Sequence, residues 1–261
     1  MSFKVKVIQF DIKLKNQTTN RDKIYKLISS NDTEKTDLFV LPETFTTGFD
    51  KEIFDNVTKY AETESGKTIN MLKQLALEYN TWIVCGTIIE KDNSNYYNTS
   101  FLINNKGMIN GKYRKMHLFS PCDEDKAITN GENLPVFNTK LGRLAIMTCY
   151  DIRFVEISRL YSLKGTEAII VVANFPKPKI NHWRTLLQAR AIENQIYIIA
   201  CNRIGKNYFG HSLIIDPWGE IIEEGNNKET IISGIIDVNK IKEVRNKIPM
   251  YKDRHPENYS F

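Results

Sequence analysis

The chain carries a cysteine, a glutamate and a lysine at three places where a strand-like run ends. Cys149 follows an apolar run and precedes a polar stretch that leads into a helical pattern. Glu43 and Lys115 end two further runs, at residues 38–43 and 111–115. A thiol at the exit of a buried strand, next to the start of a helix, faces a cleft with backbone N–H groups nearby. This pattern predicts a nucleophile that works with a carboxylate and an ammonium group.

These residue types suit the hydrolysis of an amide. The reaction needs a nucleophile, a group that takes the thiol proton and returns it to the leaving nitrogen, and positive charge near the developing oxyanion. We expect Cys149 to attack the amide carbon and Glu43 to relay the proton. Lys115 and the N–H of Tyr150 would hold the oxyanion. A free thiol with an ordinary pKa of roughly 8.5 is mostly protonated at neutral pH, so a neighbouring base or cation is required.

Each of these residues also has a structural interpretation when it is taken alone. A cysteine at the end of an apolar strand is more often a packed core residue than a nucleophile. Glu43 could be a first-turn acid of a short helix, and Lys115 could be an ordinary charge on an edge strand. The hydrolytic interpretation therefore depends on the three residues meeting in the fold.

Length and composition indicate an ordinary globular protein. A chain of 261 residues can bury one large core, so residues 1–261 are expected to form a single domain. The hydrophobic content of 41% and the charged content of 26% are typical of such proteins. The formal charge of +5 is spread over 36 basic and 31 acidic residues without a basic run, so no nucleic-acid partner is predicted.

The cysteine pattern and the apolar runs predict a reduced, cytoplasmic protein. No CxxC pair or histidine spacing suited to zinc accompanies Cys85, Cys122, Cys149 and Cys201, so no metal site is expected. The first eleven residues alternate and carry charges, unlike a signal region. No apolar run reaches the roughly 20 residues of a membrane helix, so no membrane partner is expected.

Short β-rich runs alternate with helical patterns along the chain. Strands are predicted at residues 5–10, 37–41, 82–89, 98–103, 108–113, 167–173, 196–201, 211–215, 220–223 and 231–238. Helices are predicted at residues 20–29, with Asn20 as the cap, and at residues 69–79, 154–163 and 182–194. The segment 117–132 has no clear period and carries Pro121, so it is predicted to be a long loop. This order fits two sheets packed face to face with helices outside.

Four segments resemble the nitrilase, or carbon–nitrogen hydrolase, superfamily. They are LPETFTTGF at 41–49, GKYRKMHLF at 111–119, CYDIRFVE at 149–156 and HWRTLLQARAIENQIYIIACNRIG at 182–205. The resemblance runs over nearly the whole length. It implies an α/β fold, a four-layer α-β-β-α sandwich of two mixed six-stranded sheets, which usually dimerises across a helical face. It also implies a Glu-Lys-Cys triad that maps onto Glu43, Lys115 and Cys149.

The string CYDIRF at 149–154 is similar to the ω-amidase branch of that superfamily. The branch hydrolyses the terminal amide of short 2-oxo acids, such as 2-oxoglutaramate or 2-oxosuccinamate, to a dicarboxylate and ammonia. No metal or organic cofactor is expected, because cysteine and glutamate cover the nucleophile and the proton transfer. Other substrates of the same triad remain open, namely another amide, an N-carbamoyl compound or a nitrile. A non-catalytic scaffold that keeps the fold is a further alternative.

The resemblance also implies a second glutamate in the loop after the lysine. Glu124, nine positions after Lys115, fits the spacing, but Asp123 and Asp125 flank it and leave the register open. Cys122 stands in the same loop and is predicted to be incidental rather than catalytic.

Substrate-binding residues are expected after the nucleophile and after the strand that ends at Asn174. Asn174 and Phe175 should lie near the pocket, and relatives often have tryptophan in place of Phe175. Lys179 stands where relatives often place arginine, and Arg153 is close to the nucleophile, so either cation could bind a substrate carboxylate. Lys179 is equally well explained as solvated surface. Val155 stands where many relatives have proline.

Overall fold

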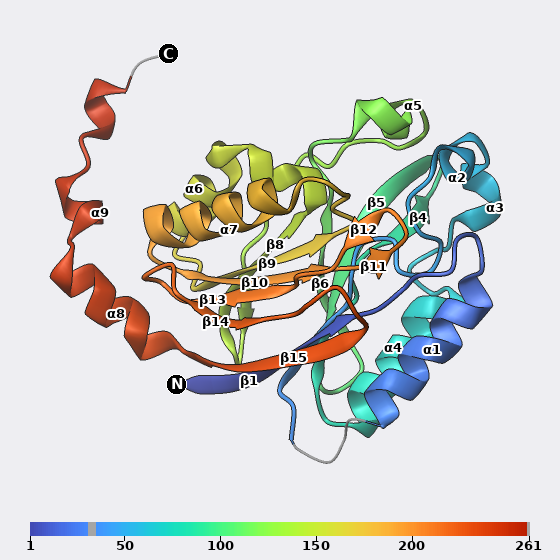
Figure 1. Cartoon of the computed structure of the whole chain (residues 1–261), viewed down its shortest axis with the longest axis horizontal. Helices are drawn as coiled ribbons and strands as arrows, with labels where there is room; N and C mark the ends of the chain where they lie inside the picture. The colour runs from blue at the N-terminus through green and yellow to red at the C-terminus, as the bar shows by residue number, and fades with distance from the viewer. Residues whose placement is uncertain (31–34, 260–261) are drawn as a thin grey trace.

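The computed structural model, which describes residues 1–30 and 35–259, contains two large mixed β-sheets stacked face to face between outer helices (Figure 1). The first sheet has the strand order β15-β1-β2-β3-β5-β4, and β6 pairs with β5. Its members are β1 (Ser2–Gln9), β2 (Leu38–Val40), β3 (Trp82–Val84), β4 (Ile88–Asp92), β5 (Asn95–Ile103), β6 (Ile109–Arg114) and β15 (Thr230–Asp237). The α-β-β-α architecture expected from the sequence is confirmed.

The second sheet has the strand order β14-β13-β10-β9-β8-β7. Its members are β7 (Phe137–Thr139), β8 (Gly142–Thr148), β9 (Ala168–Ala173), β10 (Tyr197–Asn202), β13 (Leu213–Ile215) and β14 (Ile221–Glu224). A separate two-stranded ribbon is formed by β11 (Ile204–Gly205) and β12 (Tyr208–Phe209). The prediction of six strands is correct for this sheet and wrong for the first one, which has seven.

Two helices cover the outer face of each sheet (Figure 1). The first sheet carries α1 (Gln17–Ser29) and α4 (Lys67–Glu78), and the second carries α6 (Val155–Leu163) and α7 (Ile180–Asn194). The other helices are α2 (Lys51–Asp55), α3 (Val57–Tyr60), α5 (Glu124–Ala127), α8 (Val238–Lys247) and α9 (Met250–Asp253), none of which was predicted from the sequence. In the described part of the chain, no helix has both the length and the apolar character needed to cross a bilayer.

Alternation of side chains along each central strand builds three separate apolar layers. In β9, Ile170 and Val172 join the core between the two sheets, whereas Ile169 and Val171 join the core beneath α6 and α7. A third apolar layer lies between the first sheet and α1 and α4. Because β9 is buried on both faces, it reads as a continuous apolar run in the sequence.

The prediction of one strand at 82–89 is wrong in part, because the strand is interrupted between β3 and β4. Gly86 sits there at a φ of +61°, a backbone conformation that favours glycine. A Cβ atom at this position would lie 2.0 Å from the carbonyl oxygen of Pro42. The adjacent Thr87 accepts the backbone N–H of Thr44 on its Oγ1 at 2.7 Å. The break therefore lets this segment support the turn that carries Glu43.

Two further expectations are corrected by tertiary contacts. Asn16, not Asn20, caps α1, because the Asn20 side chain is buried and donates to the carbonyls of Lys13 and Thr46. The segment 117–132 is not entirely loop. It contains a 3₁₀ turn at Ser120–Cys122 and the short helix α5.

Candidate active site

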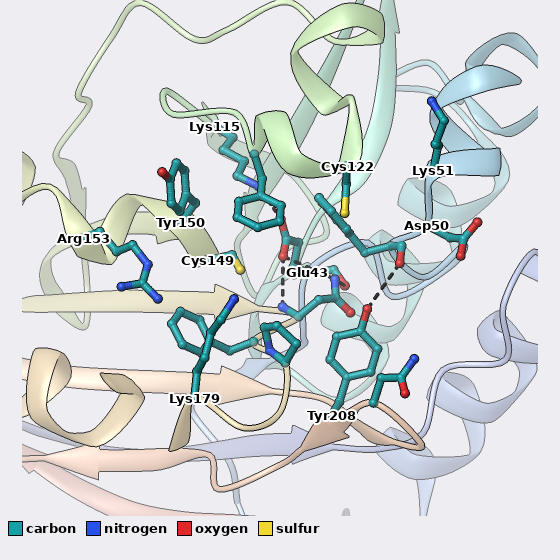
Figure 2. Close-up of a pocket in the computed structure, with 16 residues that line it drawn as sticks. Glu43, Asp50, Lys51, Lys115, Cys122, Cys149, Tyr150, Arg153, Lys179 and Tyr208 are labelled. Atoms are coloured by element: carbon teal, nitrogen blue, oxygen red, sulfur yellow. Dashed lines mark hydrogen bonds and ion pairs between the residues drawn. The ribbon is translucent and has the colours of Figure 1, made fainter. Parts of the chain in front are cut away.

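A cavity of about 360 Å³ opens where the ends of several core strands meet (Figure 2). Glu43 follows β2, Lys115 follows β6, Cys149 follows β8 and Asn174 follows β9, and all four line the cavity. The structure thus brings together the three residues that the sequence singled out at strand exits. A pocket of this size suits a small linear molecule.

Glu43 is fully buried, and both of its carboxylate oxygens are occupied by donors. Its Oε1 accepts from Lys115 Nζ at 2.9 Å and from Asn98 Nδ2 at 3.0 Å. Its Oε2 accepts from the backbone N–H of Asn174 at 2.9 Å. The Asn174 side chain also donates to the carbonyl of Glu43 at 2.8 Å, which joins the two sheets at this point. The carboxylate is therefore held in one orientation.

Lys115 places its ammonium between two buried carboxylates. Its Nζ lies 2.9 Å from Glu43 Oε1 and 2.8 Å from Glu124 Oε2, and all three side chains are inaccessible to solvent. Burial acts to lower the pKa of Lys115, but the charges of Glu124 and Glu43 outweigh burial and hold the pKa above its ordinary value. The lysine is therefore a fixed positive charge rather than a proton donor.

Glu124 is the acidic residue of its loop that enters the site. Its Oε2 accepts the N–H of Phe119 at 2.7 Å, and its Oε1 accepts from Asn98 Nδ2 at 2.8 Å. Burial raises the pKa of Glu124, Lys115 opposes the rise and Glu43 adds to it. Asp123 instead forms ion pairs with Lys51 and Lys126 near the surface. The structure thus selects Glu124 from the candidates that the sequence left open.

Asn98 is a site residue that was not identified from the sequence. Its Nδ2 bridges Glu43 and Glu124, so a single amide group holds the two carboxylates on either side of Lys115. The hairpin predicted at 98–113 was the one feature of the sequence that could have identified this residue. In the hairpin, the backbone N–H of Lys115 donates to the carbonyl of Asn98 at 2.9 Å, so the two residues lie side by side.

Cys149 begins the 3₁₀ turn Cys149–Arg153 at a φ of +47°, which is unusual for a residue with a side chain. The residue is half-buried because it lines the cavity. Burial and the negative charge of Glu43 raise the pKa of the Cys149 thiol well above its ordinary value, and Lys115 acts in the opposite direction. The resting thiol is therefore protonated at neutral pH and needs a base to become a nucleophile.

Tyr150 follows Cys149 in the turn, and its ring forms part of an aromatic rim. The ring lies edge-on to Phe119 and to Phe154, with centroids 5.2 Å apart in both pairs. The backbone N–H that was predicted to hold the oxyanion belongs to this residue. Its place directly after the nucleophile is consistent with that prediction.

The two cations that were predicted to bind a substrate carboxylate, Arg153 and Lys179, both line the cavity and form its cationic side. Figure 2 shows Arg153 and Lys179 on one side of Cys149, opposite Asp50 and Lys51. The Arg153 guanidinium lies 5.4 Å from the centroid of the Phe175 ring, and Lys179 Nζ lies 5.8 Å from that of Phe119. Within residues 1–30 and 35–259, neither cation has a carboxylate within ion-pair distance.

The far wall contains residues that sequence reasoning did not find. Tyr208 comes from the ribbon formed by β11 and β12, which reaches the cavity through a bridge to Pro176. Its hydroxyl donates to the carbonyl of Phe49 at 3.3 Å, and burial raises the pKa of Tyr208 to about 12. Cys122 also lines the cavity, so it is closer to the site than the sequence implied.

Among the described residues, no cluster of histidine, cysteine, aspartate or glutamate side chains is arranged to hold a metal ion. The buried charged side chains beside Cys149 form ion pairs with one another instead. Lys115 pairs with both Glu43 and Glu124.

The fold and the cavity are those of a carbon–nitrogen hydrolase. The profile of the carbon–nitrogen hydrolase family matches residues 4–246, and the chain belongs to this family. The chain is 36% identical over 263 residues to the 2-oxoglutaramate amidase of Bacillus subtilis, and this alignment covers 99% of this chain and 100% of that protein. It is 31% identical over 272 residues to the omega-amidase NIT2 of Xenopus tropicalis, with 99% and 97% covered.

Solved structures show the same architecture. Nit3 of Saccharomyces cerevisiae, described as a member of branch 10 of the nitrilase superfamily, superposes with a TM-score of 0.88 at 29% identity over 97% of each chain. A superfamily protein of Xanthomonas campestris, which has an arsenic adduct in its active site, superposes with a TM-score of 0.91 at 26% identity. That comparison covers 100% of this chain and 99% of the other.

Replacing Lys115 with methionine leaves two buried carboxylates without their cation. We expect the free energy of unfolding to fall by about 3–5 kcal/mol at neutral pH. Because Lys115 opposes the rise in the pKa of Glu124, its removal raises that pKa further. A carboxyl group whose pKa is raised by folding destabilises the folded state less as the pH falls, so the deficit should shrink from pH 8 toward pH 5. Urea unfolding of both proteins across this range measures the deficit.

The double variant Lys115→Met, Glu124→Gln is the control for this experiment, because it removes the second buried charge together with the first. It should recover much of the lost stability at neutral pH. A deficit that is independent of pH would show that Glu43 and Glu124 do not repel each other in the variant.

Proposed function

We propose that this chain is an ω-amidase-like hydrolase that releases ammonia from the terminal amide of a short 2-oxo acid such as 2-oxoglutaramate or 2-oxosuccinamate. The proposal is carried by the Lys115 ammonium, which contacts Glu43 and Glu124 beside Cys149 in one cavity. It is supported by the relatives, one named 2-oxoglutaramate amidase and others named omega-amidases. Residues 1–261 would act as a single domain.

In the first half of the proposed reaction, the sulfur of Cys149 forms a bond to the amide carbon and its proton passes to Glu43. A proton acceptor is needed because burial keeps the thiol protonated. The carbonyl oxygen gains a negative charge, which Lys115 Nζ and the Tyr150 N–H stabilise. Glu43 then gives the proton to the nitrogen, and the carbon–nitrogen bond breaks. Ammonia departs, and the acyl group remains bound to Cys149 as a thioester.

In the second half, water attacks the thioester carbon. Glu43 accepts a proton from the water, and the same two donors stabilise the new oxyanion. The carbon–sulfur bond breaks, the sulfur recovers its proton from Glu43, and the acid leaves. The role proposed for Glu124 is to hold Lys115 at the site and keep it charged, since it contacts Nζ directly. No step requires a metal or an organic cofactor.

The cationic side of the cavity supports a substrate with a carboxylate at the end opposite to the amide. Arg153 and Lys179 line the cavity beside the reactive sulfur, and Phe175 lies beneath the guanidinium. Asn174 and Phe175 would fix the width of the pocket from the strand end. A carboxylate bound between two cations orients the amide toward Cys149, which lowers the entropic cost of the attack.

We also propose that the protein is a cytoplasmic homodimer or higher homo-oligomer. Four apolar side chains are exposed on the outer helices α6 and α7, namely Val155, Leu160, Leu163 and Ile192. Several exposed apolar side chains on one outer helical layer are typical of a surface that pairs with another copy.

The function is tested by measuring ammonia release from a panel of compounds, which consists of 2-oxoglutaramate, 2-oxosuccinamate, glutamine, N-carbamoyl amino acids and nitriles. The 2-oxo acid amides should have the highest kcat/KM, and Cys149→Ala should abolish the turnover. A clear preference for a carbamoyl compound or a nitrile would assign the same site to a different substrate. Absence of turnover for every compound would favour a non-catalytic scaffold.

Replacing Lys179 with methionine should weaken the binding of 2-oxoglutaramate. Loss of a charged hydrogen bond corresponds to a rise in KM of about tenfold to a hundredfold, with a small change in kcat. A neutral amide such as butyramide has no distal carboxylate, so its kcat/KM should not change. Lys177→Met is the matched control, because Lys177 is exposed and does not line the cavity. Equal effects on both substrates would contradict the proposed carboxylate contact.

Sedimentation velocity tests the oligomer. The double variant Leu160→Glu, Ile192→Glu should shift the protein toward a monomer, because it places charge among the exposed apolar side chains of α6 and α7. Leu77→Glu is the control, since Leu77 is exposed on α4 at the other outer layer. A wild-type protein that sediments as a monomer at micromolar concentration would contradict this part of the proposal.

A further inference from the structure

Asp151 is a fully buried carboxylate that lies outside the set of residues lining the cavity. It accepts four hydrogen bonds from two different segments. Its Oδ2 accepts from Tyr113 Oη at 2.7 Å and from the backbone N–H of Thr148 at 2.9 Å. Its Oδ1 accepts from the backbone N–H and from Nδ1 of His117, both at 3.0 Å. A buried carboxylate with this many donors is held rigidly.

The donors flank two of the reacting groups in the sequence. Tyr113 and His117 stand two residues before and two residues after Lys115, and Thr148 directly precedes Cys149. The Tyr113 hydroxyl also accepts the N–H of Met116 at 3.3 Å. Asp151 is therefore a direct link between the segment that carries the ammonium and the turn that carries the thiol.

The turn needs such support, because Cys149 has a φ of +47°. This conformation is strained for a residue with a side chain and persists only when neighbouring contacts hold it. Arg190 holds the other end of the turn by donating to the carbonyl of Ile152 at 2.8 Å. Asp151 connects the turn that begins at Cys149 to the segment 113–117, which carries Lys115.

The orientation of His117 is fixed by a second contact. Its ring stacks on Phe154 with centroids 3.5 Å apart and an interplanar angle of 6°, and Phe154 in turn lies against Tyr150. With the ring held in this way, Nδ1 faces the carboxylate and carries the shared proton. The network therefore also reaches the residue whose N–H completes the proposed oxyanion site.

We propose that Asp151 is a positioning residue that sets the placement of the Cys149 sulfur relative to the Lys115 ammonium, through Tyr113, His117 and the Thr148 N–H. The inference rests on the proposed function for the roles of Cys149 and Lys115. The hydrogen bonds that Asp151 accepts come from neighbours of these two groups, and Asp151 does not line the cavity. Loss of its hydrogen bonds displaces the two reacting groups relative to each other, and a displacement of about 1 Å lowers the rate about a hundredfold.

Tyr113→Phe is the mildest test, because it removes a single hydroxyl and keeps the buried ring. We expect kcat to fall about tenfold with little change in KM. Tyr161→Phe is the matched control. Tyr161 is equally buried, but its hydroxyl donates to the carbonyl of Ile146 in the strand that leads to Cys149 and not to Asp151. Its kcat should stay within about twofold of the wild-type value.

Asp151→Asn tests the carboxylate itself. An amide has one oxygen in place of two, and its nitrogen cannot accept a hydrogen bond. The backbone N–H of either Thr148 or His117 therefore loses its acceptor. We expect kcat to fall about tenfold to a hundredfold. Asp216→Asn is the control, since Asp216 is also buried and accepts the N–H groups of Trp218 and Glu220 in a turn away from the cavity. Thermal unfolding of both variants gives the folded fraction against which each rate is corrected.

His117 supplies a rescue experiment. Asparagine can place its Nδ2 near the position of the histidine Nδ1 and still donate to Asp151, whereas leucine fills the space and cannot. His117→Asn should therefore retain most of the wild-type kcat, and His117→Leu should lose as much as Tyr113→Phe. Equal losses in the two variants would overturn the hydrogen-bonded role of His117.

The placement of Cys149 is also measured without a substrate, by the rate of alkylation with iodoacetamide followed on individual cysteine peptides. The ratio of Cys149 to Cys122 alkylation should fall in Asp151→Asn and Tyr113→Phe and stay at the wild-type value in the two controls. An unchanged or increased ratio would overturn the proposal. If the wild-type protein released no ammonia from any 2-oxo acid amide, the proposed function would fail, while this ratio would still decide the role of Asp151.

Discussion

The site depends on the contact of one ammonium group with two carboxylates, all of them inaccessible to solvent. A lysine cannot be buried as a cation without compensating charge, because desolvation of an unpaired ammonium costs several kcal/mol. Lys115 meets this requirement through Glu43 and Glu124, and Asn98 separates and satisfies the two carboxylates. Burial and the negative charge of Glu43 favour the neutral form of the neighbouring thiol, whereas Lys115 favours its thiolate form.

Backbone strain occurs at or beside Glu43 and Cys149, the two residues that are proposed to exchange the thiol proton. Thr44, directly after Glu43, has a φ of +39°, and Cys149 has a φ of +47°. Each conformation is held by contacts between distant segments. Thr87 supports the first through its hydroxyl, and Asp151 supports the turn of the second by accepting from Tyr113 and His117. Strain of this kind at a strand exit turns the side chain away from the sheet and toward the cavity.

The sequence predicted those parts of the site that follow from local pattern. Strand exits and residue types identified Glu43, Lys115 and Cys149. Glu43 and Cys149 follow the parallel strands β2 and β8. Lys115 follows β6, which pairs antiparallel with β5, and β5 pairs antiparallel with β3, so β6 runs in the same direction as β3. What the sequence did not reveal depends on contacts between remote segments. Asn98 enters the site through the register of a hairpin, and Tyr208 enters through a ribbon that bridges to Pro176.

The errors in the predicted fold have the same origin. Asn20 has the residue type of a helix cap, but its side chain is buried and bonded to the carbonyl of Thr46. The apolar run at 82–89 has the composition of one strand, but Gly86 approaches the Pro42 carbonyl and divides it into two. Local propensity was overridden in both places by the requirement to satisfy a buried polar group or to pass close to another backbone.

The cavity is built from two kinds of chain segment, and this division affects how the protein family can diversify. The groups proposed to react stand at the ends of core strands, whereas the wall around Lys179 and Tyr208 belongs to connecting segments. Those segments pair mainly with each other, as in the hydrogen bond from the Lys177 N–H to the Asn207 carbonyl at 2.9 Å. Substitutions in them therefore reshape the substrate end of the cavity at little cost to the core. A common chemical centre of this kind allows descendants of one gene to acquire different nitrogen compounds as substrates.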